Sequence, residues 1–398
     1  MNEKTFPLAP LAGIDNASPR DDALMTGGDD GRRVFLREAA DVTIDHGRAS
    51  LRPGLRQVSS AALRCLWQSP LHGDVFAAEG AQWVKVSPGD WSRTPLAEVG
   101  PGDVSHLVLN GQVLAATDDG IWRYNGQNAQ RLTLERPAGP MVAAGAGSLV
   151  AGHYGVAVAW LRGALEGPLS AMTGCTVPAD GALNITLPLC LDASVTGARL
   201  YLTRPDGGEL LRAGDYPAAQ TVVQVPLLPE LGAPPAFAGM EPMPGGQYLA
   251  LWRGRLVVAR GSVLRLSEAL AYHVHHPLHG FVQMPQRITF VAPVDAGLFV
   301  GQVDHVAFLR GADLQELALE RRTAATPVAG SALELPAEDA GQAGDGARPV
   351  VAWLASNGFA LGTPDGGIIE PHARRLQGIA GARGTCVVFG GRLAAAVT

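Results

Sequence analysis

The sequence predicts an all-β protein, specifically a β-propeller of about six blades. Three observations predict this fold: turn-forming residues are abundant, tight-turn dipeptides separate short apolar runs, and such units recur along the chain. Gly and Pro contribute 50 and 29 of the 398 residues, whereas only 17% of the residues are charged. With 47% hydrophobic residues, the chain can bury a large core. This composition argues against a helical bundle, a coiled coil and a disordered polymer.

The clearest repeat unit lies at residues 104–126, where Asn-Gly, Asp-Gly and Asn-Gly pairs follow three short apolar runs. These dipeptides are strong hairpin signals because their residues tolerate positive φ. Three of them in succession predict a four-stranded meander, which is one propeller blade. Similar units are expected at residues 73–86, 147–160, 253–268, 296–311 and 357–371. The final stretch, residues 386–397, is expected to pair with residues 50–66 and close the ring.

One segment, at residues 167–235, breaks this pattern. It contains longer alternating strands with their own turns, which are typical of a small fibronectin-like or immunoglobulin-like β-sandwich inserted into the propeller. The remaining regions are then an extended N-terminal arm at residues 1–45, the first blades at 46–166 and the last blades at 236–398. A short helix is an option at residues 33–40.

Two features bear on membranes and export. The uncharged stretch at residues 140–160 is about as long as a membrane helix, but its glycines predict two short strands. The N-terminus has no basic start followed by an apolar core, so no signal peptide is expected. The formal net charge of −6 argues against nucleic-acid binding.

The sequence predicts no catalytic, cofactor-binding or metal-binding residues. The phosphate-binding loop, the nucleophile elbow and the zinc-protease motif are all absent from it. Four cysteines stand far apart and are expected to act as small buried hydrophobes. A bond between Cys175 and Cys190 remains an open alternative.

Two groups of residues offer weaker alternatives. Four histidines, His273, His275, His276 and His279, lie within seven residues; a polar loop is favoured over a metal site or a pH-dependent contact. A propeller enzyme would need two or three neighbouring carboxylates in its channel. The candidates on loops are Asp74, Asp118, Glu268, Asp304 and Glu370. The pair Arg374-Arg375 is expected to lie on a solvated face.

Several short segments carry a resemblance to a known family. The segments GIDN at residues 13–16, DVTIDHG at 41–47 and RPG at 52–54 resemble the N-terminal region of tailed-bacteriophage virion proteins that build β-propellers. Residues 200–207 look like a strand of the fibronectin-like insert of these proteins. Residues 266–300 look like one of their blades.

This resemblance implies a non-enzymatic structural component of a bacteriophage virion, either a tail protein or a neck ring or nozzle protein. It implies a homo-oligomer whose arm clamps neighbouring subunits. The expected partners are copies of the chain in a ring, other tail or neck proteins and a host surface, and no cofactor is expected. The protein would be assembled in the host cytoplasm and reside in the virion tail. The alternatives are a host-surface or glycan-binding propeller and a carboxylate-dependent hydrolase or lyase.

Overall fold

The computed structural model describes residues 10–19, 25–28, 31–52, 54, 56–323, 325–336 and 348–398. In this part of the chain the regular structure is β-strand, apart from one 3₁₀ turn at Leu314–Glu316. The helix offered for residues 33–40 is wrong, because β3 (Gly31–Leu36) is a strand and no helix follows it. No helix in the described residues has the length and apolar character needed to cross a bilayer.

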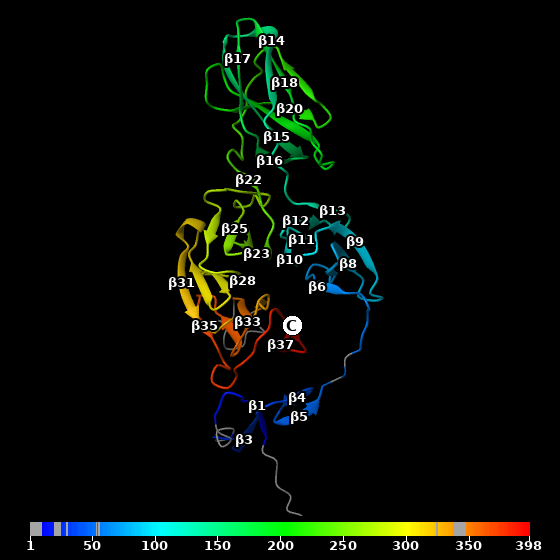
Figure 1. Cartoon of the computed structure of the whole chain (residues 1–398), viewed down its shortest axis with the longest axis vertical. Coiled ribbons are helices and arrows are strands. Elements are labelled where there is room, and N and C mark those ends of the chain that lie inside the picture. The colour runs from blue at the N-terminus through cyan, green and yellow to red at the C-terminus, as the bar shows by residue number, and fades with distance from the viewer. Residues whose placement is uncertain are drawn as a thin grey trace, which may run out of the picture. The chain divides into compact units, whose positions relative to one another are not determined.

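The chain divides into two compact units, which are described separately. The terminal unit comprises Met1–Ala61 and Pro285–Thr398, and the central unit comprises Ala62–Met284. Both consist of small sheets, as Figure 1 shows. The strands of the described residues pair antiparallel except for β1 (Leu11–Ile14) and β3 in the terminal unit, which pair in parallel.

The central unit contains three four-stranded antiparallel sheets with the strand order of propeller blades. The first is β6 (Leu63–Gln68), β7 (Val75–Glu79), β8 (Gln82–Val86) and β9 (Arg93–Glu98). The second is β10 (Ser105–Leu109), β11 (Gln112–Thr117), β12 (Gly120–Tyr124) and β13 (Ala129–Arg131). The third is β23 (Gln247–Trp252), β24 (Arg255–Arg260), β25 (Val263–Leu266) and β27 (Phe281–Gln283).

The second sheet confirms the meander predicted at residues 104–126. Its first turn has Asn110 at φ 51° and Gly111 at φ 71°, both in the left-handed region. A two-residue hairpin turn of this type matches the twist of the strands it joins, and Asn-Gly adopts it at little cost. The dipeptide therefore sets the register in which Leu109 pairs with Gln112.

An aromatic cluster fills the core between the first and second sheets. Trp83 and Phe76 are completely buried there, with ring centroids 5.7 Å apart. The Nε1 of Trp83 donates a hydrogen bond of 3.1 Å to Nε2 of His106. Trp67 stacks on the same imidazole with ring centroids 5.2 Å apart. Burial lowers the pKa of His106 to about 3, so the ring is neutral at pH 7.

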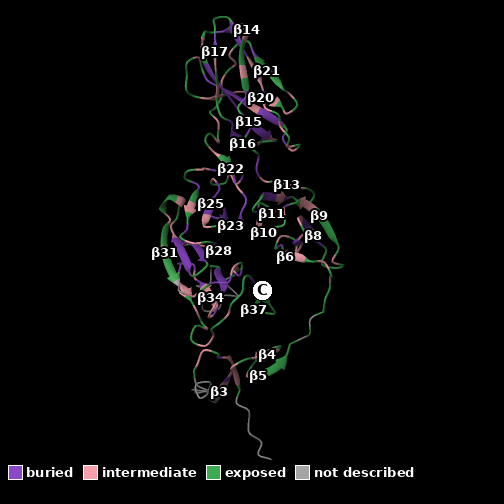
Figure 2. Ribbon diagram, in the orientation of Figure 1, coloured by how far each residue is buried: buried purple, intermediate pink, exposed green. Residues whose placement is uncertain are grey.

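The central unit also contains a sandwich of two sheets. One sheet is β14 (Met141–Leu149), β18 (Gly181–Thr186) and β21 (Val222–Val225). The other is β16 (Leu165–Leu169), β15 (Gly152–Arg162), β19 (Gly197–Leu202) and β20 (Leu211–Pro217), with β17 (Thr173–Val177) paired to β15. Buried side chains from both sheets, among them Tyr154, Leu183 and Leu200, form one core. Figure 2 shows this burial concentrated around β15 and β16.

The sandwich starts earlier than residue 167, so both the predicted boundary and the blade expected at residues 147–160 are wrong. Strand β14 pairs with β18, and β15 pairs with β19. A turn flanked by small residues occurs in blades and in sandwiches alike, so the local pattern could not distinguish them. Residues 140–160 form two strands and no helix, as predicted, but the strands are not short: β14 has 9 residues and β15 has 11.

The terminal unit contains two further four-stranded sheets of the blade type. The first is β28 (Ile288–Val294), β29 (Gly297–Gln302), β30 (Val306–Arg310) and β31 (Ala318–Thr323). The second is β32 (Leu333–Leu335), β33 (Val350–Ala355), β34 (Gly358–Gly362) and β35 (Ile368–Ile369). Phe290, Phe299, Phe308 and Trp353 pack together in their common core. Strands β36 (Gly384–Phe389) and β37 (Arg392–Val397) pair with each other, and ring closure stays a prediction.

The N-terminal segment forms two small sheets within the terminal unit. Strands β1 (Leu11–Ile14), β3 and β2 (Met25–Gly28) form one, and β4 (Val42–Asp45) and β5 (Arg48–Leu51) form the other. The segment predicted as an extended arm therefore carries paired strands, and its second hairpin runs past the expected boundary at residue 45. We call residues 10–51 the arm.

Candidate functional site

The arm is held on the C-terminal part of the terminal unit by Asn16. Its Nδ2 donates to the carbonyl oxygen of Gln377 at 3.0 Å, and its Oδ1 accepts from the Gln377 amide nitrogen at 2.9 Å. The Nε2 of Gln377 donates to the carbonyl oxygen of Asn16 at 3.2 Å. The amide nitrogen of Asn16 adds a bond of 2.9 Å to the carbonyl oxygen of Arg375. These bonds form a reciprocal clasp across 361 residues of sequence.

Asp15 shapes the turn that presents Asn16. Its carboxylate accepts from the amide nitrogen of Ser18 at 2.9 Å and from the Ser18 hydroxyl at 2.8 Å. These bonds hold the pKa of Asp15 below its usual value. The backbone of Asp15 also donates to the carbonyl oxygen of Leu36 at 2.8 Å. In the polar half of the GIDN segment, Asp15 therefore fixes the turn and Asn16 docks the arm.

Two further contacts hold the arm in place. The Arg375 guanidinium carbon lies 3.8 Å from the centre of the Phe35 ring, a cation–π contact. Asp45 in the β4–β5 hairpin forms an ion pair of 3.0 Å with Arg392 in β37. The expectation of a solvated face is wrong for Arg375, which is partly buried under the arm. The sequence predicted a docking arm, but nothing in it indicated the residues on which the arm docks.

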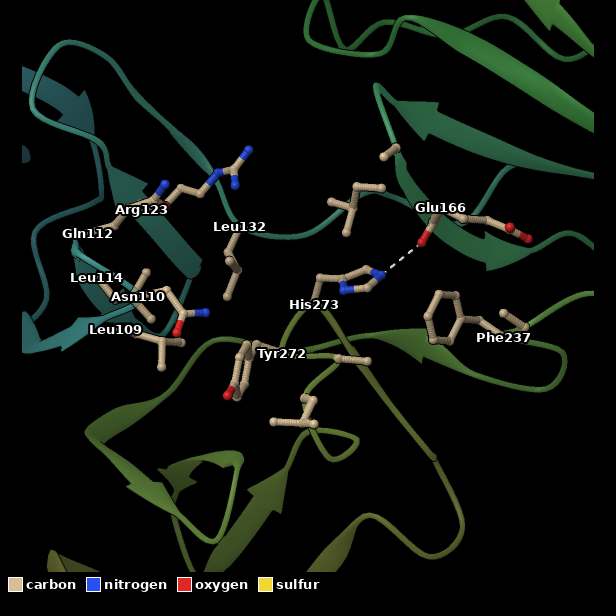
Figure 3. Close-up of a pocket in the computed structure, with 15 residues that line it drawn as sticks. Leu109, Asn110, Gln112, Leu114, Arg123, Leu132, Glu166, Phe237, Tyr272 and His273 are labelled. Carbon is tan, nitrogen blue, oxygen red and sulfur yellow. Dashed lines mark hydrogen bonds between the residues drawn. The ribbon is translucent and has the colours of Figure 1, made fainter.

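A pocket of about 470 Å³ lies in the central unit, between the second sheet, the start of the sandwich and the chain around residue 272. Its apolar walls include Leu109, Leu114, Leu132, Leu165 and Phe237. Figure 3 shows the imidazole of His273 extended across the pocket toward the backbone of Glu166. The pocket combines several apolar side chains with a few polar groups, which is the usual composition of a small-molecule site.

The polar side of the pocket is basic. Arg123 lines it, together with Asn110, Gln112 and Tyr272. Burial, and secondarily the charge of Arg162, lower the pKa of Arg123, and the guanidinium nevertheless remains charged. Arg162 lies in β15 with its side chain only 8% exposed. It donates to the carbonyl oxygen of Arg131 at 2.8 Å and to the Ser194 hydroxyl at 2.8 Å, and so ties the blade to the sandwich.

The acidic side chain at the pocket is engaged elsewhere. The carboxylate of Glu166 accepts from Nη1 of Arg199 at 2.7 Å and from the hydroxyl of Tyr201 at 2.5 Å. Figure 3 shows this carboxylate pointing away from Arg123. The carbonyl oxygen of Glu166 accepts from His273 Nε2 at 2.8 Å, which assigns the proton to Nε2. His273 therefore links β16 of the sandwich to the chain just before β26 (Val274–His275), a strand that pairs with β22 (Glu241–Pro242).

The histidine cluster is not a single polar loop. His273 and His275 are buried, and burial is the largest cause that lowers the pKa of each. His276 and His279 contact each other with ring centroids 4.5 Å apart. Nowhere in the described residues do three or more His, Cys, Asp or Glu side chains gather in a metal-binding arrangement. The polar-loop expectation is thus wrong for the first two histidines.

Each of the five carboxylates considered for an enzyme contacts a residue outside that set. In the central unit, Asp74 directly precedes β7, Asp118 lies in the turn after β11, and Glu268 follows β25; the other two lie in the terminal unit. The pairs are Asp74 with Lys85 at 2.8 Å, Asp118 with Gln247 at 3.4 Å, Glu268 with Arg255 at 3.4 Å, Asp304 with His305 at 2.5 Å and Glu370 with Asn357 at 3.1 Å.

The cysteines are free thiols. Cys175 and Cys190 each pack against the sandwich core without forming a disulfide, which decides the alternative that the sequence left open. Cys386 is buried in the terminal unit, and burial raises the pKa of its thiol to about 11.

The sequence matches no protein-family model and no curated protein. Among solved structures, the chain is similar to BBS1N in complex with ARL6DN, at 11% identity over 84% of this chain and 92% of that chain, with a TM-score of 0.34. It is also similar to Sqt1 of Saccharomyces cerevisiae, at 11% identity over 82% and 76% of the two chains, with a TM-score of 0.32. The computationally designed protein Ika8 is 13% identical over 85% and 94%, with a TM-score of 0.26. Because these TM-scores are low, the assignment of blade-type sheets rests on the strand topology of the chain itself.

Proposed function

We propose that this protein is a non-enzymatic structural component of a bacteriophage virion, a tail protein or a neck ring or nozzle protein. The observation that carries the proposal is the docked arm. The GIDN segment, which is part of the resemblance to propeller-forming virion proteins, supplies Asn16, which forms the clasp with Gln377, and Asp15, which fixes the turn that presents Asn16. A short segment that fastens an N-terminal arm to another part of the protein is what a subunit of a larger assembly needs.

We also propose the finer architecture. The five four-stranded sheets of the described residues and the β36–β37 hairpin would together form a propeller of about six blades. The sandwich at residues 141–225 would be the fibronectin-like insert. A propeller closed in this way leaves few exposed strand edges, which suits a rigid part of a particle.

The clasp offers a direct way to join subunits. It uses backbone groups and the side chains of Asn16 and Gln377, and the same bonds can form between two copies if their arms exchange. Exchange of an identical element adds no new surface and costs little free energy. The proposed partners are therefore other copies in a ring, together with further tail or neck proteins and a host surface.

The first test is the mass of the protein in solution, measured by light scattering, with and without residues 1–40. We expect a ring-sized species for the full chain and, after truncation, a monomer whose mass is about a tenth below the 41.4 kDa of one full chain. Circular dichroism of the truncated protein should retain its β-sheet signal. A full-length protein that stays monomeric would contradict self-assembly and favour a soluble binding propeller.

The second test is a cysteine pair at the clasp, N16C with Q377C. Under mild oxidation, arm exchange predicts covalent dimers and a ladder of larger species on a denaturing gel. The single variants N16C and Q377C control for the four native thiols. A disulfide formed only within one chain would show that each arm docks on its own subunit, which would contradict exchange.

A further inference from the structure

We propose that the pocket of the central unit binds an organic acid, a carboxylate attached to an aliphatic body, through the guanidinium of Arg123. This proposal goes beyond the virion role and does not depend on it. It concerns a small-molecule site at the junction of the second sheet and the sandwich.

The charge of Arg123 is the first argument. With the Gln130 amide turned so that its oxygen faces the guanidinium, this oxygen accepts from Nε at 2.9 Å and from Nη2 at 2.5 Å. Gln130 is neutral, so it satisfies donors without balancing the charge. Arg162 repels Arg123 and lowers its pKa further after burial. A bound anion would relieve both the desolvation and the repulsion.

The second argument is that no acid of the pocket competes for Arg123. Glu166 is the acidic residue among those that line it, and its carboxylate is occupied by Arg199 and Tyr201. Arg162 has its own partner, because Asp192 lies 3.3 Å from its Nη2. The guanidinium of Arg123 is therefore available to the carboxylate of a ligand.

The third argument is the shape and composition of the rest of the pocket. Leu109, Leu114, Leu132, Leu165 and Phe237 give it an apolar lining that favours a hydrocarbon body. Its volume of about 470 Å³ lies in the range of small-molecule sites. A ligand whose carboxylate lies beside Arg123 and whose alkyl chain lies along the leucines would match both the charged side and the apolar side of the pocket.

The test measures the binding of octanoate to the full-length protein by isothermal titration calorimetry. We expect binding by the wild type and an affinity at least tenfold lower for R123M. The neutral analogue 1-octanol should bind R123M and wild type equally, because Met keeps the apolar part of the side chain. The matched control R260M, at an exposed arginine outside the pocket, should bind octanoate like the wild type.

A second variant guards against a folding defect in R123M. A236W fills the pocket from an exposed lining position and should abolish binding of both probes while thermal unfolding stays unchanged. Two outcomes overturn the proposal: wild type binds octanoate no tighter than about 10 mM, or R123M binds it as well as wild type.

The carboxylate can come from a free acid or from the end of a polypeptide. A short apolar peptide with a free C-terminus, compared with its C-terminal amide, separates these sources. Binding of octanoate without binding of the peptide identifies a free acid as the ligand. Binding of the peptide acid but not of its amide identifies a chain end.

Discussion

Acidification from pH 7 to pH 4.5 is expected to lower the free energy of unfolding by about 2 kcal/mol through His106 alone. The imidazole has a pKa of about 3 in the folded protein and 6.5 as its ordinary value. Because the folded pKa is the lower one, the unfolded chain binds the extra proton. The contribution of His106 is complete above pH 6.5 and is lost progressively as the pH falls toward 3.

The physical cause is the environment of the ring. His106 Nε2 accepts the Trp83 N–H, and Trp67 covers one face of the imidazole. Protonation at Nε2 would break the bond to Trp83 and place a charge among aromatic rings. His273 and His275 act in the same direction, since burial lowers the pKa of both.

The measurement is urea unfolding at several pH values between 4.5 and 7, a range in which most carboxylates stay ionised. H106Q keeps an acceptor for Trp83 but cannot titrate, so its stability should fall less steeply on acidification than that of the wild type. H72Q, at an exposed histidine in the same unit, should keep the wild-type slope. If the stability of H106Q falls with pH as steeply as that of the wild type, His106 is not the cause of the acid destabilisation.

Replacing Gly297 with Ala is expected to destabilise the protein by at least about 3 kcal/mol. Gly297 opens β29 at φ +155°, a conformation that L side chains rarely adopt. A Cβ at this position would lie 1.9 Å from the carbonyl oxygen of Leu309 in the paired strand β30. The obstacle is backbone, so it cannot rotate away, and the two strands must separate.

The matched control for this prediction is G378A in the same unit. Gly378 also has positive φ, +76°, but no atom lies within 4 Å of its added Cβ. In this variant the free energy of unfolding should fall only by the cost of holding Ala at positive φ, about 1 kcal/mol. Urea unfolding of both variants separates the two effects, and equal losses would show that the close approach at Leu309 has no cost of its own.

The turns were the part of the fold that the sequence determined most completely. Asn110-Gly111 predicted its hairpin because φ preferences belong to single residues and need no distant partner. Gly254, at φ 73° between β23 and β24, marks its turn in the same way, whereas Arg253 at φ 45° has no such preference. The all-β class and the blade-type meanders follow from many such turns in succession.

The candidate sites were only partly predictable. The four histidines were visible in the sequence, but the burial of His273 depends on Glu166, which lies 107 residues earlier. The pocket was not predicted at all, because Arg123 and Phe237 come to line one cavity only after the chain between them has folded into the sandwich.

Tertiary structure alone decided which strands pair and where the arm docks. Strands β14 and β15 have blade-like residues and turns, yet they belong to the sandwich. Strand β14 pairs with β18 in one sheet and β15 pairs with β19 in the other, and the side chains of the two sheets form one core. The sequence shows Asn16 only as a polar residue in a turn. Its role in holding the arm depends on the hydrogen bonds that it forms with Gln377. Turn chemistry is local and can be inferred from adjacent residues. Pairing and docking depend on surfaces that meet only in the folded chain, so short segments could not specify them.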